Sequence, residues 1–582
     1  MALRNSIRST VTHSRHLKYA ATLLAALLLV SLFSCQNGTS SRPPVVEPDT
    51  GDPTRYGTKT ELVKAVAYLK TLGLDAYYDV VFNHRMGADY RETVPLASPV
   101  VIGGTEYPSV QAWTGFHLPG RQRYYTAERW GELHHTFNWN WRAFNGTDYV
   151  EAGGSGHDLD SPVLFQGKSW PATFGYPYLM GNDVDYWYRL AAGGAYDPAG
   201  PVWAIRDEMK AWGRWIIQDI GFAGFRMDAT AHVDNGFVAE WVDYLQNEAF
   251  PDRDLFFVAE AWVGNIAGYI DAVDSANYRA TGGREGMNSS SLRAFDFGLR
   301  SDFVSLSSGS KDMRNWGGLE KVGYGDRAVT FVDNHDTNRA GNPYGTPQVD
   351  NYKNQAYAYM LMRNWTIPTV YARDWDEFGM APTLRKLVEA RRYFAYGDSV
   401  EMIADVTGNA NTQEVYAFRR AGDPGIPGTG LVLLLSGRNT GGAHTHWVNT
   451  GLPEGTEFVD ITGNRTETVE ANVDGWAPFT VNLAEGTGWS VWVQKAYSTR
   501  AAYPVIPADQ VNQTVYQFFY WDAYPDLWKH LSNPVSRLSG IARDLATAGV
   551  TGVWLPPAAR AFSGRYDVGY GVKDFWDLGE EF

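Results

Sequence analysis

Short apolar runs alternate with amphipathic stretches along the first two thirds of this chain. The apolar runs predict buried strands at residues 74–84, 224–229, 255–262, 327–336 and 367–372. A 3.6-residue period predicts helices at residues 58–73, 202–221, 234–249, 354–365 and 382–395. Alternation of strands and helices predicts a parallel α/β architecture, the main part of a barrel, over residues 55–395.

Two segments break this alternation. Residues 85–195 are irregular and rich in glycine, aromatic residues and aspartate, which indicates an inserted domain. Residues 396–495 contain short strands separated by turn residues, which is typical of an all-β sandwich. A linker, 496–512, leads to a tail, 513–582, that reads as strand, helix and strand.

The tail lacks an element that its last strand needs. A buried parallel strand is normally covered by a crossover helix, but none follows residues 550–557. The segment after the N-terminal tether, in contrast, begins with a helix that has no strand before it. About six strands there and two in the tail make eight.

The N-terminus indicates export. Basic residues precede an apolar run, 19–34, that is short for a membrane span and typical of a signal peptide over residues 1–35. The run ends at Cys35, the only cysteine, and "LFSC" resembles a bacterial lipoprotein box. We expect a lipid-anchored protein at the bacterial cell surface or periplasmic side, with simple cleavage and secretion as the alternative. Residues 36–54 predict a flexible linker.

The composition limits the classes of partner that the protein is expected to bind. A net charge of −15 argues against nucleic acid or an anionic membrane surface as the main partner. Aromatic residues make up 14% of the chain, and flat apolar rings suit the faces of sugars, although they are also ordinary core residues.

Polar residues stand at the carboxyl ends of four predicted strands. They are Asn83 and His84, Arg226 and Asp228, Glu260, and His335 and Asp336. In α/β barrels these ends meet at one face, so the side chains are expected to converge. Two carboxylates that flank a glycosidic bond can act as nucleophile and general acid, and we expect Arg226 to keep Asp228 ionised. Any one acid alone would more often be a helix cap or a loop salt bridge.

These segments carry a family resemblance. "DVVFNH", "GFRMDATAH", "FVAEAW" and "FVDNHD" resemble, in order, the four conserved segments of the α-amylase family of glycoside hydrolases. "FNWNWRAFNGTDY" and "YLMGNDVDY" resemble the inserted domain of bacterial liquefying-type members, and the likeness covers residues 56–495. The resemblance implies a (β/α)8 TIM barrel that hydrolyses α-1,4-glucans with retention, with Asp228 as nucleophile, Glu260 as acid/base and Asp336 as third acid.

The resemblance also implies a substrate site and a rearranged chain. His84, Arg226 and His335 would line the sugar site, Tyr570 would stack on the sugar, and Trp262 would stack in the next subsite or stand at the rim. The tail is similar to the N-terminal start of these enzymes, so the order is circularly permuted and residues 58–73 are the missing helix. We expect a monomer. A tail-swapped dimer and an artefact of gene assembly are the alternatives.

The sequence leaves alternatives for the binding of a metal and for the products of the reaction. By resemblance, Asn83, Asp183 and the His232 carbonyl would hold calcium, with Asp185 close by. Asn145, Pro171 and Pro177 stand where relatives carry aspartates, so a calcium-independent enzyme is an equal alternative. A maltooligosaccharide-forming or transglycosylating member of the family, and a non-catalytic starch-binding surface protein, are alternative functions.

Overall fold

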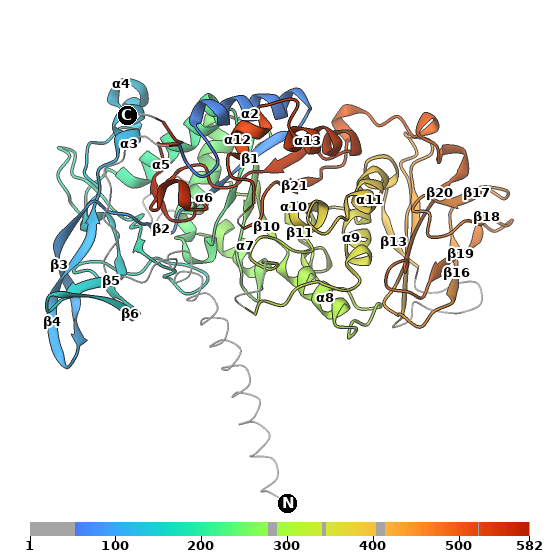
Figure 1. Cartoon of the computed structure of the whole chain (residues 1–582), viewed down its shortest axis with the longest axis horizontal. Coiled ribbons are helices and arrows are strands. Elements are labelled where there is room, and N and C mark those ends of the chain that lie inside the picture. The colour runs from blue at the N-terminus through green and yellow to red at the C-terminus, as the bar shows by residue number, and fades with distance from the viewer. Residues whose placement is uncertain (1–52, 277–287, 340–344, 403–413, 522, 581–582) are drawn as a thin grey trace, which may run out of the picture.

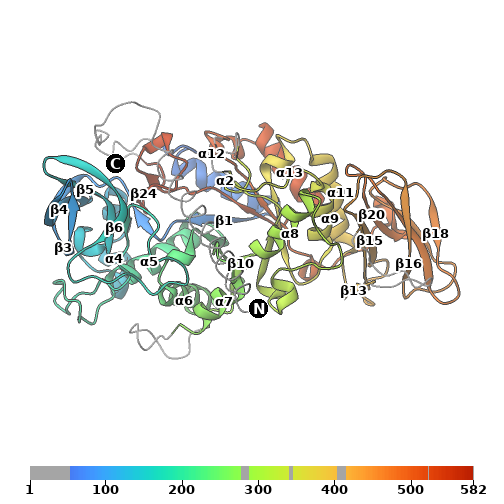
Figure 2. The same cartoon turned by 90° about the horizontal axis from the view of Figure 1, so that it is seen from below.

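The computed structural model describes residues 53–276, 288–339, 345–402, 414–521 and 523–580. The predicted signal peptide, Cys35 and all but the last residues of the 36–54 linker lie outside the described residues, so export and the lipid anchor stay predictions. Among the described helices none is long and apolar enough to cross a membrane. A barrel lies in the middle of the molecule, with a small sheet at one end and a β-sandwich at the other (Figures 1 and 2).

Eight parallel strands form a closed barrel, as predicted. Around the ring they are β1 (Asp75–Val80), β8 (Gly224–Met227), β9 (Phe256–Ala259), β10 (Leu292–Phe295), β11 (Ala328–Phe331), β12 (Ile367–Tyr371), β21 (Val515–Gln517) and β22 (Gly552–Trp554). The ring closes where β22 pairs in parallel with β1. Sequence inspection did not locate β10.

Helices follow the strands around the outside of the barrel. They include α5 (Ala204–Trp215), α6 (Asn235–Asp243), α7 (Ile266–Asp274), α8 (Phe297–Ser307), α9 (Lys353–Met362) and α11 (Ala381–Phe394). The first helix of the described residues, α2 (Lys59–Thr71), begins with a capping box between Thr58 and Glu61. Each of these helices turns a row of buried residues toward the strands.

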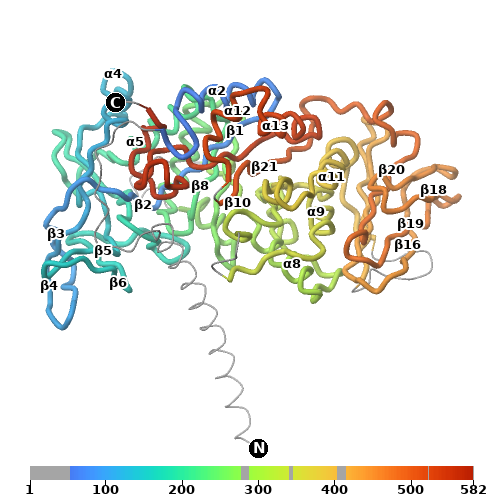
Figure 3. Tube along the Cα trace, viewed as in Figure 1, coloured from blue at the N-terminus to red at the C-terminus, as the bar shows by residue number. Residues whose placement is uncertain are grey.

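The tail packs beside the beginning of the described chain. Its helices α12 (Leu527–Leu531) and α13 (Arg537–Ala548) lie next to α2, red beside blue in Figure 3. The backbone N–H of Lys59 donates to the Gly579 carbonyl at 3.3 Å, and the N–H of Asp526 donates to the Arg55 carbonyl at 3.1 Å. The chain's own tail therefore supplies two of the eight strands, next to the helix that its last strand lacked.

The inserted segment is more regular than its sequence suggests. It contains a four-stranded antiparallel sheet of β3 (Tyr90–Ile102), β4 (Thr105–Gly115), β5 (Gly146–Ala152) and β6 (Ser155–Leu164). Both long hairpins turn at Gly-Gly pairs, 103–104 and 153–154, whose φ angles are all positive. Such pairs favour two-residue hairpin turns, and they were the signal that the sequence offered for this sheet.

The β-sandwich packs one of its sheets against the barrel. That sheet has the order β13 (Ser399–Glu401), β14 (Val415–Arg420), β15 (Leu431–Ser436), β20 (Trp489–Gln494), β17 (Glu457–Asp460) and β18 (Thr468–Glu470). A second sheet pairs β16 (Ala443–Asn449) with β19 (Trp476–Asn482). In β15, Leu433 and Leu435 join the barrel core while Val432 and Leu434 face the sandwich interior, which explains the unbroken apolar run.

Candidate active site

One buried guanidinium organises the carboxylates at the strand ends. Arg226 lies on β8, and its Nη1 donates to Asp228 Oδ1 and to Asp79 Oδ1, both at 2.7 Å. Its Nη2 pairs with Glu260 Oε2, also at 2.7 Å. The predicted Arg226, Asp228 and Glu260 therefore come together, as expected from adjacent parallel strands.

Sequence reasoning missed Asp79. It lies on β1 opposite Arg226, is fully buried, and its second oxygen accepts from Tyr570 Oη at 2.8 Å and Trp554 Nε1 at 2.9 Å. In "DVVFNH" this aspartate reads as part of an apolar strand. A carboxylate inside a buried run was the available signal, because such a charge needs a partner.

The tail completes the other side of the site. Tyr570 Oη also contacts His335 Nε2 at 2.8 Å, and the two rings are stacked at 5.4 Å with an angle of 8°. The backbone carbonyl of Tyr570 contacts His84 Nε2 at 3.0 Å. Tyr570, His84 and His335 therefore lie together, as predicted, and the contacts join both ends of the chain.

Asp336 lies beside His335 and two residues of the tail. Its Oδ2 is 3.2 Å from His335 Nε2, and its Oδ1 accepts from Trp521 Nε1 at 3.3 Å. Gln517 Nε2 contacts His335 Nδ1 at 2.9 Å. The sequence did not single out Gln517, which is the last residue of β21, or Trp521, which follows four residues later.

Trp262 is not part of this cluster of contacts. It is partly exposed, and its ring stacks on Phe297 at 4.9 Å with an angle of 19°. Partial exposure is compatible with both roles that the sequence left open for Trp262, in the next subsite and at the rim.

Burial sets the protonation of the site. It raises the pKa of Asp228 well above its ordinary value, and Glu260 and Asp79 add to this shift while Arg226 opposes it. Burial likewise raises the pKa of Asp79 to about 6 and lowers the pKa of His84 to about 4. Arg226 acts in the expected direction, toward an ionised Asp228, but it faces three carboxylates and the effect of burial on the pKa of Asp228 is larger.

The two carboxylate oxygens of Glu260 differ in their contacts. Its Oε2 pairs with Arg226 and accepts from the Ala229 N–H at 3.2 Å, whereas its buried Oε1 has no hydrogen-bond partner within the described part of the chain. An oxygen in this position can hold a proton and present it to a bound group.

The residues predicted to hold calcium lie together but do not fit that ion. Asn83 Nδ2 donates to Asp183 Oδ1 at 3.2 Å and to the His232 carbonyl at 3.0 Å, while Asn145 Nδ2 donates to Asp183 Oδ2 at 2.7 Å. These would-be ligands thus already accept from neutral amides. The Lys168 ammonium pairs with Asp185, and both side chains are buried.

The number of carboxylates is also small for calcium. Over the described ranges, no group of three or more His, Cys, Asp or Glu side chains is arranged to hold a metal. Calcium needs roughly six to eight oxygen ligands.

Comparison with curated proteins gives a direct result. The chain is 31% identical over 465 residues to an α-amylase of Bacillus licheniformis, covering 76% of this chain and 80% of that protein. It belongs to the α-amylase family of glycoside hydrolases. Another member, a glucan 1,4-alpha-maltohexaosidase of a Bacillus species, is 30% identical over 468 residues, covering 76% of this chain and 79% of the other.

Other comparisons add little to the α-amylase assignment. No family model matches the chain. An Anoxybacillus α-amylase structure aligns with a TM-score of 0.37 and 16% identity, covering 53% of this chain and 71% of that one. An alternansucrase structure from Leuconostoc mesenteroides aligns with a TM-score of 0.43 and 14% identity, covering 64% and 45%.

Proposed function

We propose that this α-amylase family member is a retaining endo-hydrolase of α-1,4-glucosidic bonds in starch and related glucans. The observation that carries the proposal is the contact of one guanidinium, that of Arg226, with both Asp228 and Glu260, which leaves Glu260 Oε1 free. Relatives named α-amylase support the substrate class.

The proposed reaction has two steps. Glu260 gives the proton on Oε1 to the leaving glycosidic oxygen, while Asp228 attacks the anomeric carbon and forms a glycosyl-enzyme ester. Glu260, now ionised, then takes a proton from water, whose oxygen displaces Asp228 and releases the sugar. Arg226 supports this division, because its guanidinium pairs with Asp228 and opposes the rise that burial causes in the pKa of that carboxyl.

Asp336 and the aromatic rings would hold the sugar. Asp336 stands beside His335, where it would accept hydroxyl hydrogen bonds from the ring being cleaved. The Tyr570 ring is assigned the stacking position beside the nucleophile, and its hydroxyl holds Asp79. In this scheme His84, which burial keeps neutral, would bond to the same sugar.

The test is the release of reducing ends from soluble starch by residues 36–582. Asp228→Asn is expected to lower kcat by more than about 10³-fold, and Asp252→Asn, which changes an exposed carboxylate, serves as the matched control. Chromatography of the products would separate an endo-acting enzyme from a maltooligosaccharide-forming one, the activity named for one relative. A folded, starch-binding but inactive wild type would support the non-catalytic alternative.

We also infer that the chain is circularly permuted relative to its family. Support comes from the contacts between the beginning and the end of the described residues, where the Lys59 ammonium pairs with Glu580 at 3.3 Å and Tyr124 Oη donates to the same carboxylate at 2.6 Å. Joining residues 513–582 directly to 53–495 should give a protein with unchanged kcat/KM. Loss of folding in that rejoined chain, or a dimer of the native chain on gel filtration, would contradict closure by the chain's own tail.

A further inference from the structure

A buried group of four charges lies next to the loop that carries Asp336. The Lys353 ammonium bonds to Asp333 Oδ2 at 3.1 Å and to Asp374 Oδ1 at 2.6 Å. On the other side, Arg300 Nη2 donates to Asp333 Oδ1 at 2.8 Å. All four side chains are buried, so two cations balance two carboxylates out of contact with water. The proposed reaction uses none of them.

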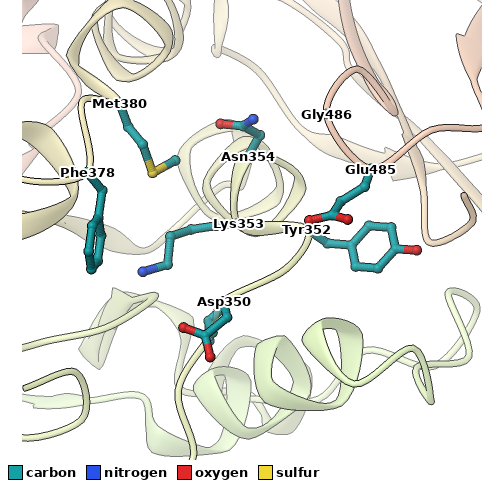
Figure 4. Close-up of a pocket in the computed structure, with 9 residues that line it drawn as sticks. Asp350, Tyr352, Lys353, Asn354, Phe378, Met380, Glu485 and Gly486 are labelled. Atoms are coloured by element: carbon teal, nitrogen blue, oxygen red, sulfur yellow. The ribbon is translucent and has the colours of Figure 1, made fainter. Parts of the chain in front are cut away.

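Lys353 connects two loops at the face of the barrel where the acids lie. It is the first residue of α9, and Figure 4 shows its side chain extending from the start of that helix. Asp333 belongs to the loop after β11, whereas Asp374 lies in α10 (Ala372–Trp375), which follows β12. Because β11 and β12 are neighbouring parallel strands, one ammonium ties together the segments at their carboxyl ends.

This is a costly place for a cation. The dipole of a helix disfavours positive charge at its N-terminus, where Lys353 stands. The preceding residue, Tyr352, has a left-handed backbone with φ 53°, which is rare for a bulky side chain. Burial also opposes ionisation, but Asp374 and Asp333 outweigh it and raise the pKa of Lys353. Buried ion pairs are often no more stabilising than apolar residues of similar volume, so these costs indicate a role other than stability.

The Asp333 carboxylate organises the turn that bears Asp336. Its Oδ1 accepts from Thr337 Oγ1 at 3.1 Å, and its Oδ2 accepts from Asn338 Nδ2 at 3.1 Å. Thr337 Oγ1 in turn accepts from the Asn334 N–H at 2.9 Å. The N–H of Asp336 donates to Asn334 Oδ1 at 3.0 Å. A short chain of hydrogen bonds therefore leads from the carboxylate that Lys353 holds to the backbone of Asp336.

We propose that Lys353 is a positioning residue, which holds Asp336 in its working place through Asp333. The task of Asp336, to bond to the sugar being cleaved, rests on the proposed function; the link from Lys353 rests on the contacts of Asp333. Hydrogen bonds to sugar hydroxyls strengthen in the transition state of glycoside cleavage. A displaced acceptor loses mainly that increase, so the loss is expected in kcat rather than in KM.

The first test is Lys353→Met in the protein of residues 36–582. We expect kcat on soluble starch to fall about 10-fold to 100-fold, the scale for a small misplacement, while KM changes less than about two-fold. Lys311→Met is the matched control: its side chain is 7% exposed, against 8% for Lys353, and its ammonium pairs with Asp302 at 2.7 Å. Lys311 lies between α8 and β11, on the side of the amino ends of the strands, so kcat should be unchanged.

A second background shows whether the effect passes through Asp336. In an Asp336→Asn protein, Lys353→Met should lower kcat by less than about two-fold more, because the positioned carboxylate is already gone. An equal loss in both backgrounds would overturn the proposal, as would an unchanged kcat in Lys353→Met alone or a loss confined to KM. If Lys353→Met does not fold, the pair Lys353→Met with Asp374→Asn cuts the same link and keeps the charges balanced.

A spectroscopic signal reports on Asp336 without turnover. Trp521 Nε1 donates to Asp336 Oδ1 at 3.3 Å, so the nuclear magnetic resonance signal of that indole N–H depends on where the carboxylate lies. With isotopically labelled tryptophan, and assignment by Trp521→Phe, this signal should shift in Lys353→Met and stay in place in Lys311→Met. An unmoved signal in Lys353→Met would overturn the link. A wild type inactive on starch would refute the proposed hydrolase, while this signal would still decide whether Lys353 positions Asp336.

Discussion

Two clusters of buried carboxylates in this molecule differ in their partners, although burial raises the pKa of Asp183 in one cluster as it raises that of Asp228 in the other. Around Arg226, three carboxylates face one guanidinium, and burial raises the pKa of Asp228 well above its ordinary value. At the junction of the inserted domain and the barrel, Asp183 accepts from two amides and Asp185 pairs with the Lys168 ammonium.

The difference reflects what each place must do. A site that moves protons needs acids whose ionised and neutral forms are close in free energy, so charge is left uncompensated there. A junction that only holds two parts together is better served when each carboxylate has its donor.

The largest effect is expected from the substitution Lys168→Met at the junction. Removing the ammonium leaves the Asp185 carboxylate buried without its ionic partner, which should lower the free energy of unfolding by about 3–5 kcal/mol. The midpoint of urea unfolding, followed by tryptophan fluorescence, measures the effect. Lys64→Met, at an exposed position of α2, is the control. A Lys168→Met protein as stable as wild type would mean that the pair does not hold the junction.

A smaller effect is expected on the other side of the comparison, from Tyr570→Phe. The ring and its stacking on His335 are kept, but the hydroxyl that bridges Asp79 and His335 is lost. We expect a fall of roughly ten-fold in kcat/KM on starch, the value of a hydrogen bond to a charged group, with unchanged urea stability. Tyr566→Phe, at an 83% exposed tyrosine, should be neutral. An unaffected kcat/KM would show that the tail closes the barrel without contributing to the site.

The sequence predicted the barrel, the sandwich and the convergence of seven polar residues at four strand ends. It could do so because parallel strands of one barrel end at one face, so that position in the chain implies position in space. Asp79 and the Gln517 and Trp521 contacts were missed, because they depend on which strand lies beside which. β1 meets β22 only once the tail has closed the ring, and Gln517 and Trp521 belong to that tail. Likewise, Lys168 lies in a loop whose course no local pattern specifies.

The pH dependence of kcat/KM in an Asp79→Asn variant tests whether Asp79 influences the ionisation of Asp228. The Asp79 carboxylate raises the pKa of Asp228 by repulsion, in addition to burial. A neutral amide removes that repulsion, so Asp228 stays ionised to lower pH and the acid limb of kcat/KM should move down by about one pH unit. Asp75→Asn, at the exposed far end of β1, is the control. A limb that stays in place or moves upward would show that Asp79 does not share protons with Asp228.

The smallest expected effect is that of metal removal. If amides and Lys168 satisfy the junction, dialysis against EDTA should leave the urea midpoint unchanged, and elemental analysis of the purified protein should find no calcium in stoichiometric amount. The Lys168→Met variant provides a comparison for the effect of added calcium. Its Asp185 lacks the ammonium, so added calcium should restore part of the lost stability there but not in wild type. Stabilisation of the wild type by calcium, with one bound ion per chain, would instead mean that Asn83 and Asn145 turn their amide oxygens toward Asp183 to ligate a metal.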